Sequence, residues 1–319
     1  MEYGIIGNCQ YSALIDTTGD VKWMCMPRFD SSFIFGGLLD QSKGGRFRVG
    51  NVDSSPGRQE YITNTNVLRT EFESTGGTFE VIDFAPRFFQ YERYYKPTML
   101  VRVVRPISGD PLLKVEVDPT YDYGQDKMTV SMGSNHIRYH GAPHTMRLTT
   151  NASLAYVTES RPFVVDKTYY FVFTYGAPLE SSMDHTCEEF LINTIRYWQD
   201  WIKHCLLPAE FQEEVIRSAL VLKLHQFEDT GAIIASATTS IPEADGSGRN
   251  WDYRYCWLRD ALFSLMALQR LTQFEEMERF VSYLRNIAES TAIQDHRLQP
   301  VYGISGEHQL TERILDYMD

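Results

Sequence analysis

The period at which apolar residues recur changes once along this chain, near residue 180, and this change limits the folds that the chain can adopt. Before that point, apolar and polar residues alternate in short runs such as Thr78–Phe84, separated by turn residues. Beyond it, apolar residues recur three and four positions apart. Alternation is typical of strands, and the longer period is typical of amphipathic helices. The sequence therefore predicts a multidomain β + α protein, with an N-terminal antiparallel β-sandwich followed by helices.

The β region is expected to consist largely of hairpins with glycine-containing turns. Three pairs of strands fit this pattern: Ser12–Asp16 with Val21–Met26, Asn66–Phe72 with Thr78–Phe84, and Met99–Val104 with Leu112–Val117. Shorter strands are expected around Met128, Ile137, Met146 and Tyr156, and a longer one over Tyr169–Tyr175. Many antiparallel strands joined by short turns are typical of two packed sheets.

The helical region is expected to hold four helices, over 183–207, about 208–227, 255 or 256 to 271, and 272–288. An extended segment, Gly231–Ser236, and a flexible run, Ala244–Arg249, separate the second helix from the third, and a short helix is expected from Thr311. So few helices do not easily enclose the apolar stripes that they carry. We therefore expect a C-terminal half or self-association to cover the exposed helices.

Composition and charge exclude several classes of partner. A net charge of -12 and a pI near 5.2 argue against nucleic acid and anionic membranes, because both require a basic face. The five cysteines are widely spaced without a C-x-x-C, and the N-terminus has no signal-peptide pattern, which predicts reduced thiols and a cytoplasmic location. Because no His or carboxylate cluster has the spacing of metal ligands, no metal or other cofactor is expected.

The stretch Asn250–Asp260 concentrates residue types that bind sugars. It contains four aromatic rings, two arginines and two aspartates. Aromatic rings stack on the apolar faces of sugars, and charged side chains bind hydroxyl groups. Trp257 and Asp260 lie three residues apart, so on a helix they would share one face. The alternative is that the rings belong to the core and that Arg259 and Asp260 form a structural ion pair.

Three segments occur in the order found in one enzyme family. They lie within Tyr3–Ser31, over Thr230–Glu243 and over Arg249–Ala261. This set resembles glycoside hydrolase family 15, the glucoamylases, glucodextranases and trehalases of bacteria and archaea. The resemblance implies a β-sandwich domain over 1–182, a linker helix over 183–207, and, over 208–319, the first helices of an (α/α)6 barrel that is truncated here.

The resemblance also implies an activity and a site. The activity is that of an inverting, exo-acting α-glucosidic hydrolase that releases glucose from non-reducing ends of α-glucans or oligosaccharides, or from trehalose. By position, Arg259 and Asp260 would hydrogen-bond the hydroxyls of the terminal glucose. Trp257 would pack near the reactive side of that glucose, and Tyr253 would stack beneath its ring.

The chain departs from the family in its carboxylates. An inverting hydrolase needs an acid and a base about 6.5–9.5 Å apart. In the family the acid belongs to a Trp-Glu motif, and no Trp-Glu occurs in this sequence. Glu307 and Glu312 are interpreted as solvated charges. The chain is therefore expected to be the N-terminal half of a hydrolase, without catalytic residues of its own and inactive alone.

Two interpretations stay open for the segment Pro27–Ser31. The favoured one is a turn that a buried Arg28–Asp30 pair holds in place, and the alternative is a loop that contacts sugar. Three functions also stay open for the chain as a whole. It is a partial glucoamylase-like enzyme, a non-catalytic β-sandwich or sugar-binding module, or one half of a split enzyme.

Overall fold

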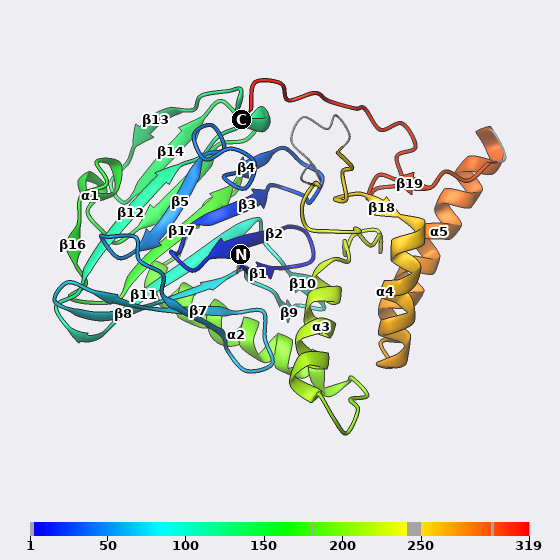
Figure 1. Cartoon of the computed structure of the whole chain (residues 1–319), viewed down its shortest axis with the longest axis horizontal. Helices are drawn as coiled ribbons and strands as arrows, with labels where there is room; N and C mark the ends of the chain where they lie inside the picture. The colour runs from blue at the N-terminus through cyan, green and yellow to red at the C-terminus, as the bar shows by residue number, and fades with distance from the viewer. Residues whose placement is uncertain (1–2, 180, 241–249, 295–296, 319) are drawn as a thin grey trace. The chain divides into compact units, whose positions relative to one another are not determined.

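The computed structural model describes residues 3–179, 181–240, 250–294 and 297–318, so the predicted flexible run Ala244–Arg249 lies outside the described residues. Its contacts divide the chain into two units, whose β strands and helices are shown in Figure 1. The β unit comprises Met1–Pro27, Ser31–Gln199 and Tyr317–Asp319. The helical unit comprises Arg28–Asp30 and Asp200–Asp316. The coarse prediction of a β-rich N-terminal region followed by helices is confirmed.

In the described part of the chain, the β unit contains three antiparallel sheets and a separate hairpin. The largest sheet is, in spatial order, β13 (Thr129–Met132), β14 (His136–His140), β15 (Met146–Thr150), β17 (Tyr169–Tyr175), β11 (Met99–Gly109), β8 (Gly77–Phe84), β7 (Leu68–Ser74) and β6 (Arg58–Tyr61). The second is β1 (Tyr3–Gly7), β2 (Ser12–Asp16), β3 (Val21–Cys25) and β4 (Phe33–Phe35). The third is β16 (Phe163–Val164), β12 (Leu112–Asp118) and β5 (Arg46–Gly50), and the hairpin is β9 (Phe88–Gln90) with β10 (Arg93–Tyr95).

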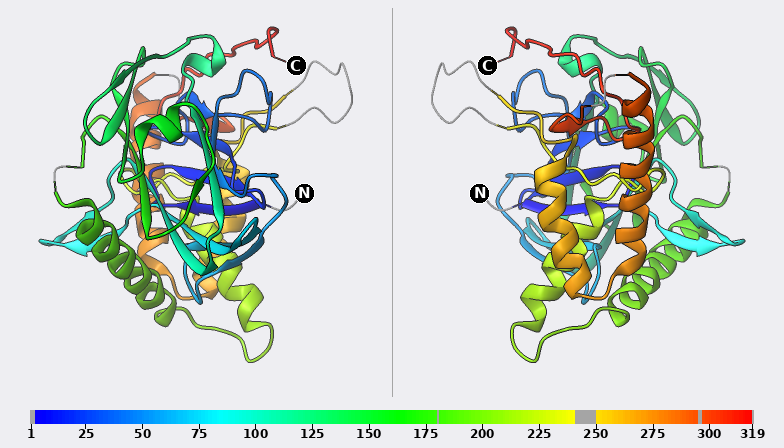
Figure 2. Two further views of the ribbon diagram at one scale, coloured as in Figure 1. Left: turned by 90° about the vertical axis from the view of Figure 1, so that its left-hand side faces the viewer. Right: turned by 90° about the vertical axis from the view of Figure 1, so that its right-hand side faces the viewer.

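These sheets share one apolar core. The Phe173 ring of β17 lies 5.4 Å from the Phe35 ring of β4 and 5.9 Å from the Phe47 ring of β5, measured between centroids. The large sheet buries its other face against the helix α2 (Met183–Lys203), where Cys187 and Leu191 pack on it (Figure 2). Both faces of its central strands are therefore covered, which explains why β17 is apolar without alternation.

Two of the three predicted hairpins are confirmed, β2–β3 and β7–β8, and the third is wrong. β11 pairs with β8 and β17, whereas β12 pairs with β5 and β16. The predicted turn fails because β11 continues through Gly109, which still pairs with Gly77. The amide of Asp110 then donates to the carbonyl of Gly76, and the chain leaves for another sheet. Glycine and proline mark the end of this strand without closing a hairpin.

The strand predicted around Tyr156 is also wrong, because this residue lies in the short helix α1 (Leu154–Thr158). Val157 is buried in the core of the β unit, and the Tyr156 ring stacks on Phe163 at 5.6 Å. The Thr158 hydroxyl donates to the carbonyl of Leu154, a bond that a helical turn permits. Another single turn, η1, covers Asp122–Gly124.

The helical unit contains the helices α3 (Gln212–Leu224), α4 (Leu258–Arg270) and α5 (Phe274–Gln294), and the short strands β18 (Cys256–Trp257) and β19 (Val301–Tyr302). Its core gathers apolar side chains from α5, from the extended segment at Ile233 and from the turn at Ile304. Phe29 belongs to this core although it lies among β strands in the sequence. None of the helices that the structure describes is long and apolar enough to cross a membrane.

Two details of the helical prediction are wrong. α3 begins at Gln212 and not near Pro208, because Phe211 has a left-handed backbone (φ 57°) that cannot continue a helix. The described residues 311–318 form no helix, since Ile314 is 79% exposed and gives such a helix no buried face.

Candidate functional site

The segment 250–257, which precedes α4, is held by backbone hydrogen bonds to two neighbouring segments. Its outer part lies against residues 236–240: the amide of Ser236 donates to the carbonyl of Tyr253 at 2.9 Å, and the amide of Ser240 donates to that of Trp251 at 2.8 Å. Its last two residues form β18, which pairs with β19. The chain then enters α4 directly. Backbone pairing on both sides therefore fixes this segment, as a binding surface requires.

Three aromatic side chains gather on this segment, and we call Trp251, Tyr253 and Trp257 the aromatic cluster. The centroid of the Trp257 ring lies 5.8 Å from those of both Trp251 and Tyr253, at interplanar angles of 89° and 57°. The indole N–H of Trp257 donates to the carbonyl of Asp252 at 2.9 Å. Trp251 is 52% exposed. The cluster is therefore a held surface that solvent can reach.

Asp252 and Arg254 fix the shape of the segment that carries the aromatic cluster. Arg254 is buried and donates to the Asp252 carboxylate from Nε at 3.0 Å and from Nη2 at 2.6 Å. The Asp252 carboxylate also accepts from the backbone amide of Arg254 at 3.0 Å. Such a two-pronged contact restrains both side chains. Its role in the structure is to hold the loop that carries the aromatic cluster.

Arg259 and Asp260 lie in the first turn of α4 and form an ion pair, with 3.2 Å between Nη2 and Oδ2. Their side chains are 74% and 33% exposed. A carboxylate in the first turn of a helix is favoured by the helix dipole. Both side chains are therefore open to solvent and keep donor and acceptor capacity for a ligand.

The predicted sharing of a helix face by Trp257 and Asp260 is wrong. Trp257 precedes α4 and has an extended backbone, with φ at -85° and ψ at 114°. The chain turns between the strand and the helix, so their spacing of three does not place them one above the other. Trp257 contacts Tyr253 instead, and Arg259 contacts Asp260, with Leu258 between the two pairs.

Trp251 and Tyr255 are the aromatic residues of this stretch to which the sequence alone assigned no role. Six residues of extended strand would separate Trp251 from Trp257 by about 20 Å. The chain instead bends at Arg254 and Tyr255, and the Trp251 ring reaches that of Trp257. The residue types indicated a ring surface, but this bend was not visible in their spacing.

The support beneath β18 is apolar and tightly bonded. Cys256 is buried, and burial raises the pKa of its thiol to about 11, which keeps it protonated at neutral pH. The buried Tyr283 of α5 donates its hydroxyl to the carbonyl of Gly303 at 2.7 Å, just beyond β19. These contacts hold the strand pair on α5, so the aromatic cluster stands on a rigid base.

The segment Pro27–Ser31 contains the Arg28–Asp30 ion pair of the favoured interpretation, but the pair is not buried, because the Arg28 side chain is 32% exposed. Arg28 donates to the Asp30 carboxylate from Nε at 2.9 Å and from Nη2 at 2.5 Å. Glu307, which was interpreted as a solvated charge, lies beside this pair, with its Oε1 3.6 Å from the Arg28 Nη2. Glu312 is exposed.

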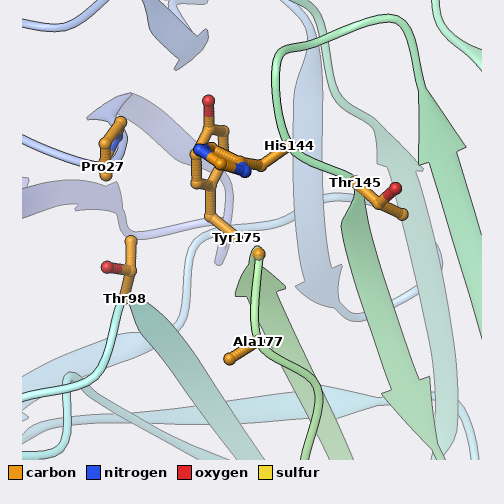
Figure 3. Close-up of a pocket in the computed structure, with 7 residues that line it drawn as sticks. Pro27, Thr98, His144, Thr145, Tyr175 and Ala177 are labelled. Atoms are coloured by element: carbon orange, nitrogen blue, oxygen red, sulfur yellow. The ribbon is translucent and has the colours of Figure 1, made fainter.

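A separate open cavity of about 540 Å³ lies in the β unit (Figure 3). It is lined by Pro27, Thr98, His144, Thr145, Tyr175, Gly176 and Ala177. The His144 and Tyr175 rings meet edge to face at 5.6 Å. None of these lining residues is a carboxylate, and none is a predicted site residue. Among the residues that the structure describes, no group of three His, Cys, Asp or Glu could hold a metal ion.

Two family models match this chain. Residues 2–161 match the model described as "Trehalase-like, N-terminal", and residues 210–316 match "Glycosyl hydrolases family 15". The chain belongs to glycoside hydrolase family 15. The second match contains Tyr253, Trp257, Arg259 and Asp260.

Relatives in the family are named trehalases. The chain is 29% identical to the trehalase of Mycolicibacterium smegmatis and 30% identical to that of Thermoplasma volcanium, in each case over 99% of this chain and 51% of the relative. It is 26% identical to Trehalase 2 of Sulfolobus acidocaldarius, over 100% of this chain and 54% of the relative. The chain therefore spans about half the length of the curated family 15 relatives that it matches.

Proposed function

We propose that this chain holds part of the terminal-glucose subsite of an inverting, exo-acting α-glucosidic hydrolase. The observation that carries the proposal is the aromatic cluster standing directly before the exposed Arg259–Asp260 pair of α4. Both features lie in the region that matches family 15. A ring surface followed by a guanidinium and a carboxylate suits a ligand with one apolar face and a rim of hydroxyls.

Each predicted residue has a distinct task in this proposal. Tyr253 and Trp257 offer rings to the apolar face of the glucose and exclude water from it. The Asp260 carboxylate accepts hydrogen bonds from sugar hydroxyls, and the Arg259 guanidinium donates to a neighbouring hydroxyl oxygen. Hydrogen bonds to charged groups contribute about 1.5–3 kcal/mol each, so this pair dominates the affinity.

Trehalose is the substrate that we propose first, because the relatives described above are named trehalases. An α-glucan or a gluco-oligosaccharide is the alternative, since each also presents a terminal glucose. All of these are neutral, and a neutral ligand is compatible with a chain whose net charge is -12. No nucleic acid or membrane enters the proposal.

We also propose that the carboxyl pair for hydrolysis lies outside these 319 residues, in the part of the relatives that the match does not reach. In this proposal α3, α4 and α5 are the first helices of an (α/α)6 barrel. Leu262, Phe263 and Met266 of α4 are 53%, 67% and 44% exposed. Further helices of the same enzyme would cover them, as barrel neighbours or as a second polypeptide.

The test compares binding with hydrolysis. The purified chain should bind trehalose and quench or shift tryptophan emission, because two indoles lie in the proposed subsite. It should release no glucose from trehalose, maltose or isomaltose. Addition of a polypeptide that supplies the remainder of a family 15 enzyme should restore hydrolysis. Proton NMR should then show equal amounts of α- and β-glucose as the first products from trehalose, because inversion changes only the anomeric carbon that water attacks.

The variant Asp260→Asn should weaken trehalose binding by about tenfold or more, since it removes a charged acceptor. Lys203→Gln, on an exposed side chain of α2, is the matched control and should bind as the wild type does. Hydrolysis by the chain alone would show that the catalytic pair is present after all. Equal affinity of Asp260→Asn and wild type would reject the subsite.

A further inference from the structure

Three residues from the N-terminal part of the sequence belong to the helical unit. Arg28–Asp30 make their contacts there, while the residues on either side belong to the β unit. Phe29 is the anchor: it is 2% exposed, and its ring meets that of Phe227 edge to face at 6.3 Å. The anchor fixes the backbone on both sides of it, so Arg28 and Asp30 are held at the surface of this core.

The Arg28 guanidinium is immobilised from several directions. Arg28 donates to the Asp30 carboxylate from Nε and Nη2, and it donates to the Ser305 hydroxyl from Nη1 at 2.8 Å. The guanidinium carbon of Arg28, Cζ, lies 5.5 Å from the centre of the Phe227 ring, which is a cation–π distance. The side chain is nevertheless 32% exposed. The structure thus presents a positioned donor group at a surface that water still reaches.

Glu307 brings a second carboxylate to the same guanidinium. Its Oε2 accepts from the backbone amide of Ser305 at 3.0 Å, and its Oε1 lies 3.6 Å from the Arg28 Nη2, beyond direct hydrogen-bond length. The side chain is 46% exposed. A Cβ at Gly303 would lie 2.1 Å from Oε2, so the carboxylate folds closely over that glycine. Glu307 is therefore oriented by the turn and by Arg28, and its half-exposed carboxylate has further acceptor capacity toward solvent.

This cluster of Arg28, Asp30 and Glu307 adjoins the strand of the proposed subsite. The turn over Gly303–Glu307 continues directly from β19, and β19 pairs with β18, which carries Trp257. The amide of Leu258, at the start of α4, donates to the carbonyl of Pro300 on the other side of β19. The two sets of polar groups are therefore carried by neighbouring, mutually bonded elements.

The charges of the cluster point to a neutral polyhydroxylated ligand. Two carboxylates around one guanidinium leave a net negative charge, which disfavours an anion such as phosphate. The half-exposed Glu307 carboxylate offers acceptors beside a fixed donor, the combination that pairs with the vicinal hydroxyls of a sugar.

We propose that Glu307 and Arg28 contact hydroxyls of the glucosyl ligand, with Glu307 accepting and Arg28 donating, and that Asp30 is a positioning residue for Arg28. This inference rests on the proposed function, because it adds a second polar wall to the same sugar site. It assigns a binding role to a segment of the N-terminal region that the aromatic cluster alone does not suggest.

The experiment titrates the purified chain with trehalose and with methyl α-glucoside, following tryptophan emission. Glu307→Gln and Arg28→Lys should each weaken binding by about tenfold, the loss expected for one charged hydrogen bond. The matched control is Glu312→Gln, the same change at an exposed carboxylate nearby, which should bind as the wild type does. The melting temperature of each variant is measured in parallel.

A second comparison separates binding from structural support. Leu268→Ala, at a fully buried position of α4 outside the cluster, should lower the melting temperature while the folded protein keeps near-wild-type affinity. If Glu307→Gln and Arg28→Lys behave as Leu268→Ala does, the inference is wrong and the cluster is structural. If they bind normally while Asp260→Asn does not, the inference fails and the proposed function stands. If the wild-type chain binds neither sugar, both fail.

Discussion

Individual side chains of the site segment divide into those that shape it and those that face outward. Asp252 and the buried Arg254 form a contact within the loop, whereas Asp260 is partly exposed at the start of α4. Both aspartates lie in the same motif, and the sequence gives no reason to separate them. The aspartate side chains are 28% and 33% exposed, but their arginine partners differ, since Arg254 is 3% and Arg259 is 74% exposed. The loss of the acceptor for a buried arginine affects folding, and its loss beside an exposed arginine affects what the surface binds.

This division yields a prediction about two parallel substitutions. Asp252→Ala should lower the free energy of unfolding by about 1.5–3 kcal/mol, because it removes a charged hydrogen-bond acceptor from a buried guanidinium. Asp260→Ala should change that free energy by less than about 0.5 kcal/mol, as expected for a surface position, but should weaken sugar binding. Urea unfolding and a trehalose titration of both variants measure this. The reverse pattern would contradict the assignment.

At the scale of elements, a buried ion pair joins the helices of the helical unit. Lys223 of α3 and Glu276 of α5 lie 2.9 Å apart, Nζ to Oε1, with side chains 5% and 3% exposed. The indole N–H of Trp201 donates to the same Oε1 at 2.9 Å, and the Gln226 side chain donates to the Glu276 carbonyl at 2.8 Å. Breaking such a pair by removing one partner is strongly destabilising.

The pair predicts how stability depends on pH. Burial by itself would raise the pKa of Glu276, but Lys223 and Trp201 outweigh it, so this pKa lies below its ordinary value of 4.5. A carboxyl with a lowered pKa in the folded state contributes stability above its unfolded pKa and loses it as pH falls. The helical unit should therefore lose stability as pH falls below about 4.5.

The measurement is the free energy of unfolding between neutral pH and pH 3 for the wild type and for Glu276→Gln. The variant should be less stable at neutral pH and should show a flatter decline. Glu275→Gln is the control, because Glu275 is the neighbouring carboxylate on the same helix and its side chain is 61% exposed. An equally steep decline in Glu276→Gln and wild type would show that other groups dominate.

The sequence predicted which segments form strands and helices better than it predicted which strands pair with one another. β2–β3 and β7–β8 followed from alternation around tight turns. The separate pairings of β11 and β12 could not be predicted in this way. Turn residues such as Gly109 and Pro111 occur both in hairpins and in connections between two sheets. For the site, residue types indicated sugar binding, but the ring contacts depend on the bend at Arg254 and Tyr255, which the residue types do not indicate.

For the whole molecule, the exposed apolar side chains of α4 predict self-association of this chain in isolation. Leu262 and Phe263 are more than half exposed, at 53% and 67%. Large exposed apolar patches mark interaction surfaces. Leu262→Glu with Phe263→Glu should shift the chain to a smaller species in light scattering. Val130→Glu, at a 56% exposed position of β13, is the control and should leave the size unchanged.

The family also implies an assembly prediction at this scale. A polypeptide that completes a family 15 enzyme should compete with self-association, because both cover α4. The double variant should then lose the ability to bind that polypeptide as well. Retained binding by the double variant would place the contact elsewhere on the molecule.

The membership of Arg28–Asp30 in the helical unit has a consequence for synthesis on the ribosome. Phe29 emerges early, yet the residues that bury it, including Phe227 and Phe280, emerge much later. The strands of the β unit can pair as they appear, but this phenylalanine stays without its binding partners until the segment that carries Phe227 has been made. The segment around Phe29 therefore stays exposed on the nascent chain until the residues that bury it have been made. A chaperone that binds short apolar segments could bind this segment during that interval.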